Sequence, residues 1–356
     1  MQTLMKGSGR FFLWPVICLV TMLLFKAAPV DAGQLPKILN QVSEVTFDNL
    51  QTAIDAANPG DTLLIQGINV GNYVITKDLN LEGRGGALLD GGNAGTVLTI
   101  FTPIAATQAV TVNLTNLTIQ EGLARSIGGG GILDVSANVI LNDCDVINNA
   151  SPLTQGGGGI LVLTSNEAPF GAFLATLTLI DTNVKFNTTT FSGGGIANFG
   201  GLVLIEDDSK ILGNVADRTG GGIFSFEGTN TIIDSILQSN AAGLQGGGLE
   251  NFFGSITTIT DSKVKHNTAG QAGGIYNGSG ANLSVEDTRF QGNSSFTLAG
   301  ALFNDSGATA ALNDSKIVEN SSVSAGGIFN NVGGVLSLTD VKFKNNIPDD
   351  IVNLNP

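Results

Sequence analysis

The chain has 356 residues, of which 42% are hydrophobic and 13% charged, so it is long enough to bury an extended apolar core. Its 30 Asp and Glu outnumber its 16 Lys and Arg, which gives a formal net charge of −14 at pH 7. Because such an acidic chain repels the phosphate backbone, we exclude nucleic acid as a partner.

The first 32 residues have the pattern of a secretory signal peptide. Lys6 and Arg10 supply the basic end, residues 11–25 the apolar stretch, and Val30-Asp31-Ala32 an A-x-A-like cleavage site. The apolar stretch is short for a stop-transfer helix, so we expect no membrane span after cleavage. An uncleaved anchor is the alternative. The predicted location is therefore secreted, periplasmic or cell-surface.

Residues 33–60 predict an N-terminal cap with one short amphipathic helix. Asp48 can cap this helix, Gln51 stands three residues later, and Pro59-Gly60-Asp61 ends it. The apolar positions on one helix face are Leu50, Ala53, Ile54 and Ala57. An uncovered coil would present a flat edge that templates aggregation, so we expect the helix to cover this end of the domain.

A repeat of 26 or 27 residues fills the chain from residue 181 onward. Each unit places an asparagine six residues after an aspartate, and a glycine-rich step into an aliphatic residue keeps the same period. The asparagines are Asn187, Asn214, Asn240, Asn267, Asn293, Asn320 and Asn346. Such units cannot bury their apolar faces alone, so they stack into a solenoid. We expect these asparagines to form a buried structural ladder at one corner.

Within one unit the residue types alternate as a half-buried strand requires. The apolar Ile259 and Val264 flank the corner residue Asp261. Next to this aspartate, Ser262 is small and Lys263 is basic. The asparagine corner is expected to tolerate left-handed backbone, and the glycine run to precede a third strand. A leucine-rich repeat is the alternative, but the glycine triplets and β-branched residues disfavour its helix.

Three segments carry a family resemblance: GGGI at Gly193 to Ile196, FQGN at Phe290 to Asn293, and FKNN at Phe343 to Asn346. They resemble the GGAI and FxxN repeats of polymorphic outer-membrane proteins. The chain from about residue 60 onward also resembles the right-handed parallel β-helix proteins of the pectate-lyase-like class. This resemblance implies an all-β solenoid of about eleven coils over residues 61–346, with residues 347–356 as a C-terminal cap or tail.

An aromatic stripe is predicted on the glycine-rich strands. If the aliphatic residue after each glycine run points inward, the residues one and three positions later point outward. The resulting candidates for glycan binding are Phe224, Phe226, Phe252, Tyr276, Phe303 and Phe329. Aromatic rings stack on the apolar faces of sugars, which is the basis of this prediction. The alternative is the reverse parity, with the rings in the core.

No catalytic residue is predicted, because no acids or cations converge on this stripe. If the protein is an enzyme, the candidates are Glu250, Asp305 and Arg218, with the two carboxylates two coils apart and near the range of inverting hydrolases. We predict a secreted or cell-surface protein with a non-catalytic binding or adhesion function, contacting polysaccharide or a cell surface. The alternative is a polysaccharide lyase or glycoside hydrolase, because one scaffold hosts both.

No cofactor or metal is predicted, because the repeat lacks the G-G-x-G-x-D nonapeptide that binds Ca²⁺. Convergence of the corner aspartates on Ca²⁺ is the alternative. Cys144 stands in the column of Thr182 and Ser209 and is expected to be a buried structural thiol. The residue two positions after the corner aspartate is basic in most units, and this row is predicted to lie on a solvated face. Its residues are Lys210, Lys263, Arg289, Lys316 and Lys342.

One unit, between Asp143 and Asp181, is longer than the others. Its two insertions, Ser151–Gln155 and Ser165–Phe173, flank the same glycine-rich strand. Loops that break the rhythm of a solenoid usually lie on its binding face, so we expect them to wall one end of a groove. A neutral surface insertion is the alternative.

Overall fold

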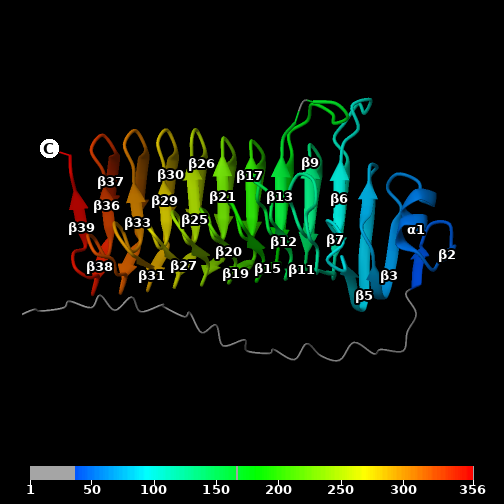
Figure 1. Ribbon diagram of the computed structural model, residues 1–356, viewed down its shortest axis with the longest axis horizontal. Coiled ribbons are helices and arrows are strands. Elements are labelled where there is room, and N and C mark those ends of the chain that lie inside the picture. Colours follow the sequence, from blue (N-terminus) through cyan, green and yellow to red (C-terminus); the bar gives the residue numbers. More distant parts are fainter. Residues whose placement is uncertain (1–36, 166, 356) are drawn as a thin grey trace, which may run out of the picture. The chain divides into compact units, whose positions relative to one another are not determined.

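The computed structural model describes residues 37–165 and 167–355, which stack as parallel strands along one axis (Figure 1). The predicted signal peptide lies outside the described residues. The strands form three sheets of 22, 11 and 6 strands, and consecutive coils pair in parallel. Eleven strands in one sheet correspond to about ten turns of chain. The predicted all-β, right-handed parallel β-helix is therefore confirmed.

The 11-stranded sheet, here the Gly-rich sheet, contains the strands that follow the glycine runs. Its strands are β4 (Tyr73–Ile75), β6 (Leu98–Phe101), β9 (Ile132–Val135), β13 (Ile160–Leu163), β17 (Ile196–Phe199), β21 (Ile223–Phe226), β25 (Leu249–Phe252), β29 (Ile275–Asn277), β33 (Leu302–Asn304), β36 (Ile328–Asn330) and β39 (Ile351–Asn353). The predicted C-terminal tail therefore contributes the last strand of this sheet.

The 22-stranded sheet takes a long and a short strand from most coils. The long strands are β3 (Thr62–Val70), β5 (Leu79–Asp90), β7 (Thr111–Thr115), β10 (Asn138–Asn142), β14 (Thr176–Ile180), β18 (Leu202–Glu206), β22 (Thr229–Ile233), β26 (Ile256–Thr260), β30 (Asn282–Glu286), β34 (Thr309–Asn313) and β37 (Val335–Thr339). The short strands are β8 (Thr118–Gln120), β11 (Asp145–Ile147), β15 (Asn183–Lys185), β19 (Lys210–Leu212), β23 (Ile236–Gln238), β27 (Lys263–Lys265), β31 (Arg289–Gln291), β35 (Lys316–Val318) and β38 (Lys342–Lys344).

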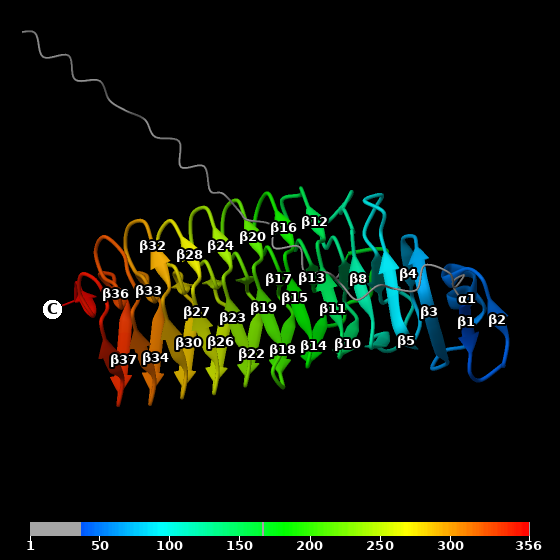
Figure 2. The same cartoon turned by 90° about the horizontal axis from the view of Figure 1, so that it is seen from below.

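A sheet of two-residue strands completes the middle coils (Figure 2). Its members are β12 (Ala150–Ser151), β16 (Thr188–Thr189), β20 (Val215–Ala216), β24 (Ala241–Ala242), β28 (Thr268–Ala269) and β32 (Ser294–Ser295). These coils thus have four strands where three were predicted. Strands this short carry too little alternation to be detected in the sequence.

The N-terminal end is covered by α1 (Leu50–Ala56), which packs against β1 (Lys37–Asn40), β2 (Thr46–Phe47), β3 and β4. Its buried side chains include Leu50 and Ile54, as the amphipathic pattern predicted. The prediction of Asp48 as the N-cap is wrong, because the N-cap is the next residue, Asn49. Asn49 has extended backbone, and its side chain accepts a hydrogen bond from the Thr52 N–H at 3.0 Å.

Left-handed residues turn the chain at both corners that the sequence predicted in each repeat. Asp261 has φ of +49° between β26 and β27, as expected of a corner aspartate. At the next corner His266 has φ of +54°, whereas the predicted left-handed residue was Asn267. The reason is that the residue before the asparagine makes the turn. The asparagine side chain is thereby directed into the interior.

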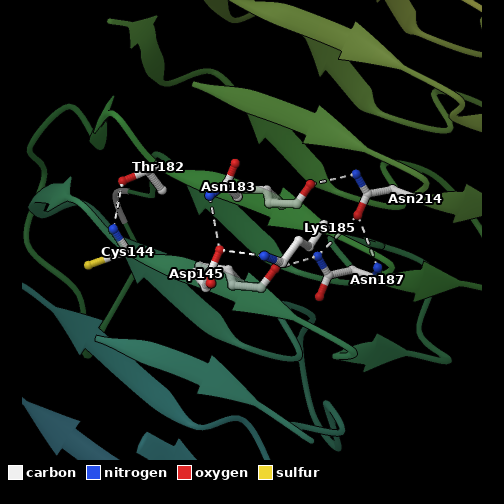
Figure 3. Close-up of polar contacts among 9 residues, drawn as sticks. Cys144, Asp145, Thr182, Asn183, Lys185, Asn187 and Asn214 are labelled. Carbon is white, nitrogen blue, oxygen red and sulfur yellow. Dashed lines mark hydrogen bonds and ion pairs between the residues drawn. The ribbon is translucent and has the colours of Figure 1, made fainter. Parts of the chain in front are cut away.

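The asparagines form the predicted buried ladder. Asn267 Nδ2 donates to the Leu237 carbonyl and to Asn293 Oδ1, both at 3.0 Å. Its Oδ1 accepts from the Asn240 N–H at 2.9 Å. The same pattern links Asn187 to Asn214 (Figure 3). It begins one coil earlier, at Asn149. Each amide therefore binds main-chain groups that protein surrounds on all sides.

A second buried column contains small polar residues and one thiol. The Cys144 N–H donates to Thr182 Oγ1 at 3.2 Å (Figure 3), and its Sγ donates to the Leu114 carbonyl at 3.4 Å. Burial raises the pKa of this thiol to about 12. Cys144 is therefore the buried structural thiol that was predicted, because the reactive thiolate is disfavoured.

Candidate functional site

The outer face of the Gly-rich sheet carries the predicted aromatic stripe. Ile275 belongs to the central core, whereas Tyr276 packs in a separate cluster with Phe303 and Phe329. The residue after each aliphatic anchor therefore points away from the central core, as the predicted parity requires. Rings of adjacent coils stack, with centroids 5.0 Å apart for Tyr276 and Phe303 and 5.5 Å for Phe303 and Phe329.

These rings leave little surface for a ligand. The side chains of Phe224, Glu250, Tyr276, Phe303 and Phe329 are between 3% and 9% exposed. The alanines that share the cluster with the last three aromatic residues are Ala272, Ala299 and Ala325. They come from the segments that enter the Gly-rich strands. The stripe thus forms a second, outer core.

Three rings at the ends of β21 and β25 do reach the surface. Phe226 and Phe252 are half-buried, and their centroids lie 6.2 Å apart. Phe253 is 54% exposed and stacks on Phe226 at 5.5 Å with an interplanar angle of 14°. Phe253 was not predicted, although its place beside Phe252 at the end of an alternating strand was a usable signal. We call these three residues the ring cluster.

Glu250 is an acid placed within the buried stripe. It lies in register between Phe224 of β21 and Tyr276 of β29. Its Oε2 is buried and has no hydrogen-bond partner. Burial raises its pKa to about 7, and a hydrogen bond with the Thr219 side chain opposes this rise. The carboxyl is thus able to hold a proton near neutral pH.

Tyr276 links this acid to the second predicted carboxylate. Its hydroxyl donates to Asp305 Oδ2 at 2.7 Å. The other oxygen of Asp305 accepts from Asn331 Nδ2 at 2.8 Å and from the Ser306 N–H at 2.7 Å. Burial, followed by the Asp305 contact and the charge of Glu250, raises the pKa of Tyr276. Glu250 and Asp305 therefore share one face with a tyrosine between them.

Arg218 does not join these acids. Its guanidinium lies 4.6 Å from the centroid of the Phe191 ring and forms no ion pair with any described residue. A cation held over an aromatic face is stabilised by the ring quadrupole. Of the three residues proposed for the enzyme alternative, Glu250 and Asp305 lie on one face near Tyr276, and Arg218 forms an ion pair with neither.

A second asparagine ladder supports this face from within and was missed in the sequence. Asn251, Asn277 and Asn304 donate through Nδ2 to the Oδ1 of the next asparagine, at 2.9, 2.8 and 2.7 Å. The last of these bonds reaches Asn330. The signal was an asparagine two residues after the aliphatic anchor, at the same 26- or 27-residue period. The ladder fixes the strands that carry the outer row.

The longer insertion lies at the N-terminal end of the same face. Phe170 packs edge-on against Phe101 at 5.5 Å, and both pack with Phe199 around the outer residues of β9 and β13. The loop encloses a hollow of about 330 Å³ lined by Thr164, Ser165, Ala172, Phe173 and Leu174. In Figure 1 this loop lies between β6 and β13 and extends further than the other turns.

Two further features are absent from residues 37–165 and 167–355. No three His, Cys, Asp or Glu side chains gather there in a way that could hold a metal ion. In the same residues, no helix is long and apolar enough to cross a membrane. The Ca²⁺ alternative remains a prediction.

Comparisons with known proteins add little. No protein-family model matches the chain, and no curated protein matches it. Among solved structures it is similar to the A-module of the mannuronan C-5 epimerase AlgE4 from Azotobacter vinelandii, with 14% identity and a TM-score of 0.28. That alignment covers 88% of this chain and 95% of the other. So low a TM-score supports no conclusion about function.

Proposed function

We propose that the protein is a secreted or cell-surface polysaccharide-binding protein without catalytic activity. The observation that carries this proposal is the ring cluster, in which Phe226, Phe252 and Phe253 present partly exposed faces on one side of the solenoid. Sugar rings stack on such faces, and a rigid scaffold presents them without a cost in chain order. We also propose that its repeats are of the type found in polymorphic outer-membrane proteins.

The same sheet face also carries polar groups that could orient a sugar, two and three coils from Phe252. Asp305 and Asn331 follow β33 and β36 on the same face and are half-buried. Gly278 stands between Phe252 and Asp305 in this outer row, and a side chain there would meet the Phe252 ring at 2.6 Å. The absent side chain therefore leaves room for the Phe252 ring itself.

A glycan array with the purified protein tests this proposal. The double variant Phe226→Ala/Phe252→Ala and the single variant Phe253→Ala should each lower glycan affinity, the double variant by roughly tenfold or more. Phe296→Ala is the matched control, because that ring is 78% exposed and belongs to a different turn. Equal affinity in the double variant and the control would remove the ring cluster as the binding site.

Glu250 favours a second candidate function, a polysaccharide lyase or glycoside hydrolase. A carboxyl with a pKa of about 7 is suited to general acid catalysis near neutral pH. Its burial, and the hydrogen bonds that occupy both oxygens of Asp305, make the binding function the preferred one. Assays for new reducing ends and for unsaturated products on polygalacturonate, alginate and neutral glucans decide between them. Turnover that Glu250→Gln abolishes would establish the enzyme.

A further inference from the structure

A column of cations lies on a different face of the solenoid. Lys263, Arg289, Lys316 and Lys342 occupy the same position in β27, β31, β35 and β38 and are paired in register from coil to coil. All four side chains are exposed or half-exposed. Lys265 and Lys344 lie two residues later in the first and last of these strands. Together the four strands hold six of the 16 Lys and Arg of the chain.

This cation column lacks acidic partners. The two ion pairs among the described residues are Arg84 with Glu82 and Lys185 with Asp145, and neither belongs to the column. Arg289 Nε donates to Gln291 Oε1 at 2.9 Å, which leaves its charge uncompensated. Each coil also carries an exposed corner aspartate two residues before the cation, and none approaches it within ion-pair distance. These aspartates are Asp261, Asp287, Asp314 and Asp340.

In the earlier coils the same strand position, which precedes the cation column, carries no stacked cations. Asp145 stands in register with Asn183 of β15, and its Oδ1 accepts from Lys185 Nζ at 2.7 Å (Figure 3). Asn183 Nδ2 donates to the same oxygen at 3.0 Å. Lys210 follows with Asn183 on one side and Ile236 on the other, so it has no cation neighbour. Stacked cations are thus confined to β27–β38.

The same face is hollowed at its C-terminal end. A depression of about 560 Å³ runs across β31, β35 and β38. It is lined by Arg289, Lys316, Val318, Glu319, Lys342, Phe343 and Lys344. Phe343 supplies apolar surface, four of the seven residues are cationic, and one, Glu319, is acidic. This combination suits a ligand with both apolar sugar faces and negative charges.

We propose that this face binds a linear acidic polysaccharide along the solenoid axis. Neighbouring strands lie about 4.8 Å apart, so the cations repeat at that interval. A chain with one carboxylate on each sugar has a charge repeat of the same order, and each carboxylate then neutralises one cation. The site is separate from the ring cluster and does not depend on neutral glycan binding there. A net charge of −14 disfavours a more densely charged polyanion such as nucleic acid.

Binding of polygalacturonate oligosaccharides to the purified protein, measured by biolayer interferometry, tests the proposal. Lys316→Glu should lower the affinity by roughly tenfold, because it reverses a charge in the middle of the column. Lys210→Glu is the matched control, since it changes the net charge equally outside the column, and it should change the affinity by less than about twofold. Lys316→Arg should retain binding.

Three results would overturn the proposal. They are no binding by the wild type at low salt, equal losses for Lys316→Glu and Lys210→Glu, and tighter binding of a single-stranded oligonucleotide than of polygalacturonate. Wild-type affinity should fall between about 0.01 and 1 M salt, over which the Debye length drops from about 30 to 3 Å. A neutral glucan captured by the ring cluster should be unaffected by Lys316→Glu, which separates this site from the proposed function.

Discussion

The buried asparagine ladder and the exposed cation column are built by the same repeat and have opposite energetics. In the ladder each amide both donates and accepts, so stacking identical side chains satisfies every member. In the cation column stacking places like charges side by side, and no described acid pairs with them. Repetition therefore stabilises the fold where the stacked group is self-complementary. Where the group repels itself, it leaves a charged surface that is open to solvent or to a ligand of opposite charge.

The largest expected effect on stability comes from Glu250, the ionisable side chain in the buried aromatic stripe. A folded-state pKa of about 7 for Glu250, above the usual 4.5, means that the fold favours the protonated acid. The stability that this pKa shift contributes is fully present below about pH 4.5 and is lost as the pH rises through about 7. Glu250→Gln should therefore stabilise the protein above neutral pH by on the order of 3 kcal/mol.

Thermal unfolding from pH 4 to 9 measures this effect, with Glu250→Gln compared against the wild type at each pH. The exposed Glu227 at the end of β21 provides the control, because Glu227→Gln removes the same charge from the surface. A Glu250→Gln curve parallel to that of the wild type would mean that folding does not shift the pKa of Glu250.

The next effect concerns the middle of the ladder. Asn267→Ala leaves the Leu237 carbonyl and the Asn240 N–H without their partners, and water cannot reach them. We expect a loss of roughly 1 to 3 kcal/mol in the free energy of unfolding. Asn346→Ala, at the 8% exposed end of the ladder, should cost less. Urea unfolding of both variants checks the ranking, and equal costs would show that burial does not set the energy.

A smaller loss is expected on the outer face of the Gly-rich sheet. Tyr276→Phe removes the hydroxyl that donates to Asp305 Oδ2 and keeps the ring in its stack with Phe303. The expected cost is about 1 kcal/mol, because Asp305 keeps its bonds to Asn331 and Ser306. Phe303→Leu, which removes a ring but no hydrogen bond, separates the contribution of stacking from that of the hydroxyl in the same assay.

The smallest effect should come from the cation column itself. Lys263→Ala removes an exposed charge with no ion pair among the described residues and should change stability by less than about 0.5 kcal/mol. A small gain is the expected sign, since the repulsion with Arg289 is relieved. A melting shift as large as that of Asn267→Ala would contradict the assignment of the two faces.

The sequence by itself determined the period, the register and the inward columns. Asp261 and Asn267 mark two corners because their residue types suit a tight turn and a buried amide, and these are local properties. Strand parity favoured the outward direction that the separate cluster of Tyr276 shows, but the sequence left the reverse parity open. The register of the cation column also follows from the repeat length, which places Arg289 beside Lys316.

Tertiary structure alone decided which outward residues remain exposed. Tyr276 is covered because Ala272 and its counterparts in neighbouring coils close over the row, and no local pattern encodes that approach. Phe253 stays exposed because it follows the strand, beyond this cover. The pairing of Lys185 with Asp145 likewise depends on a longer coil that brings residues 40 apart onto adjacent strands. Exposure and charge pairing depend on contacts between coils, whereas the repeat pattern depends on positions within one coil.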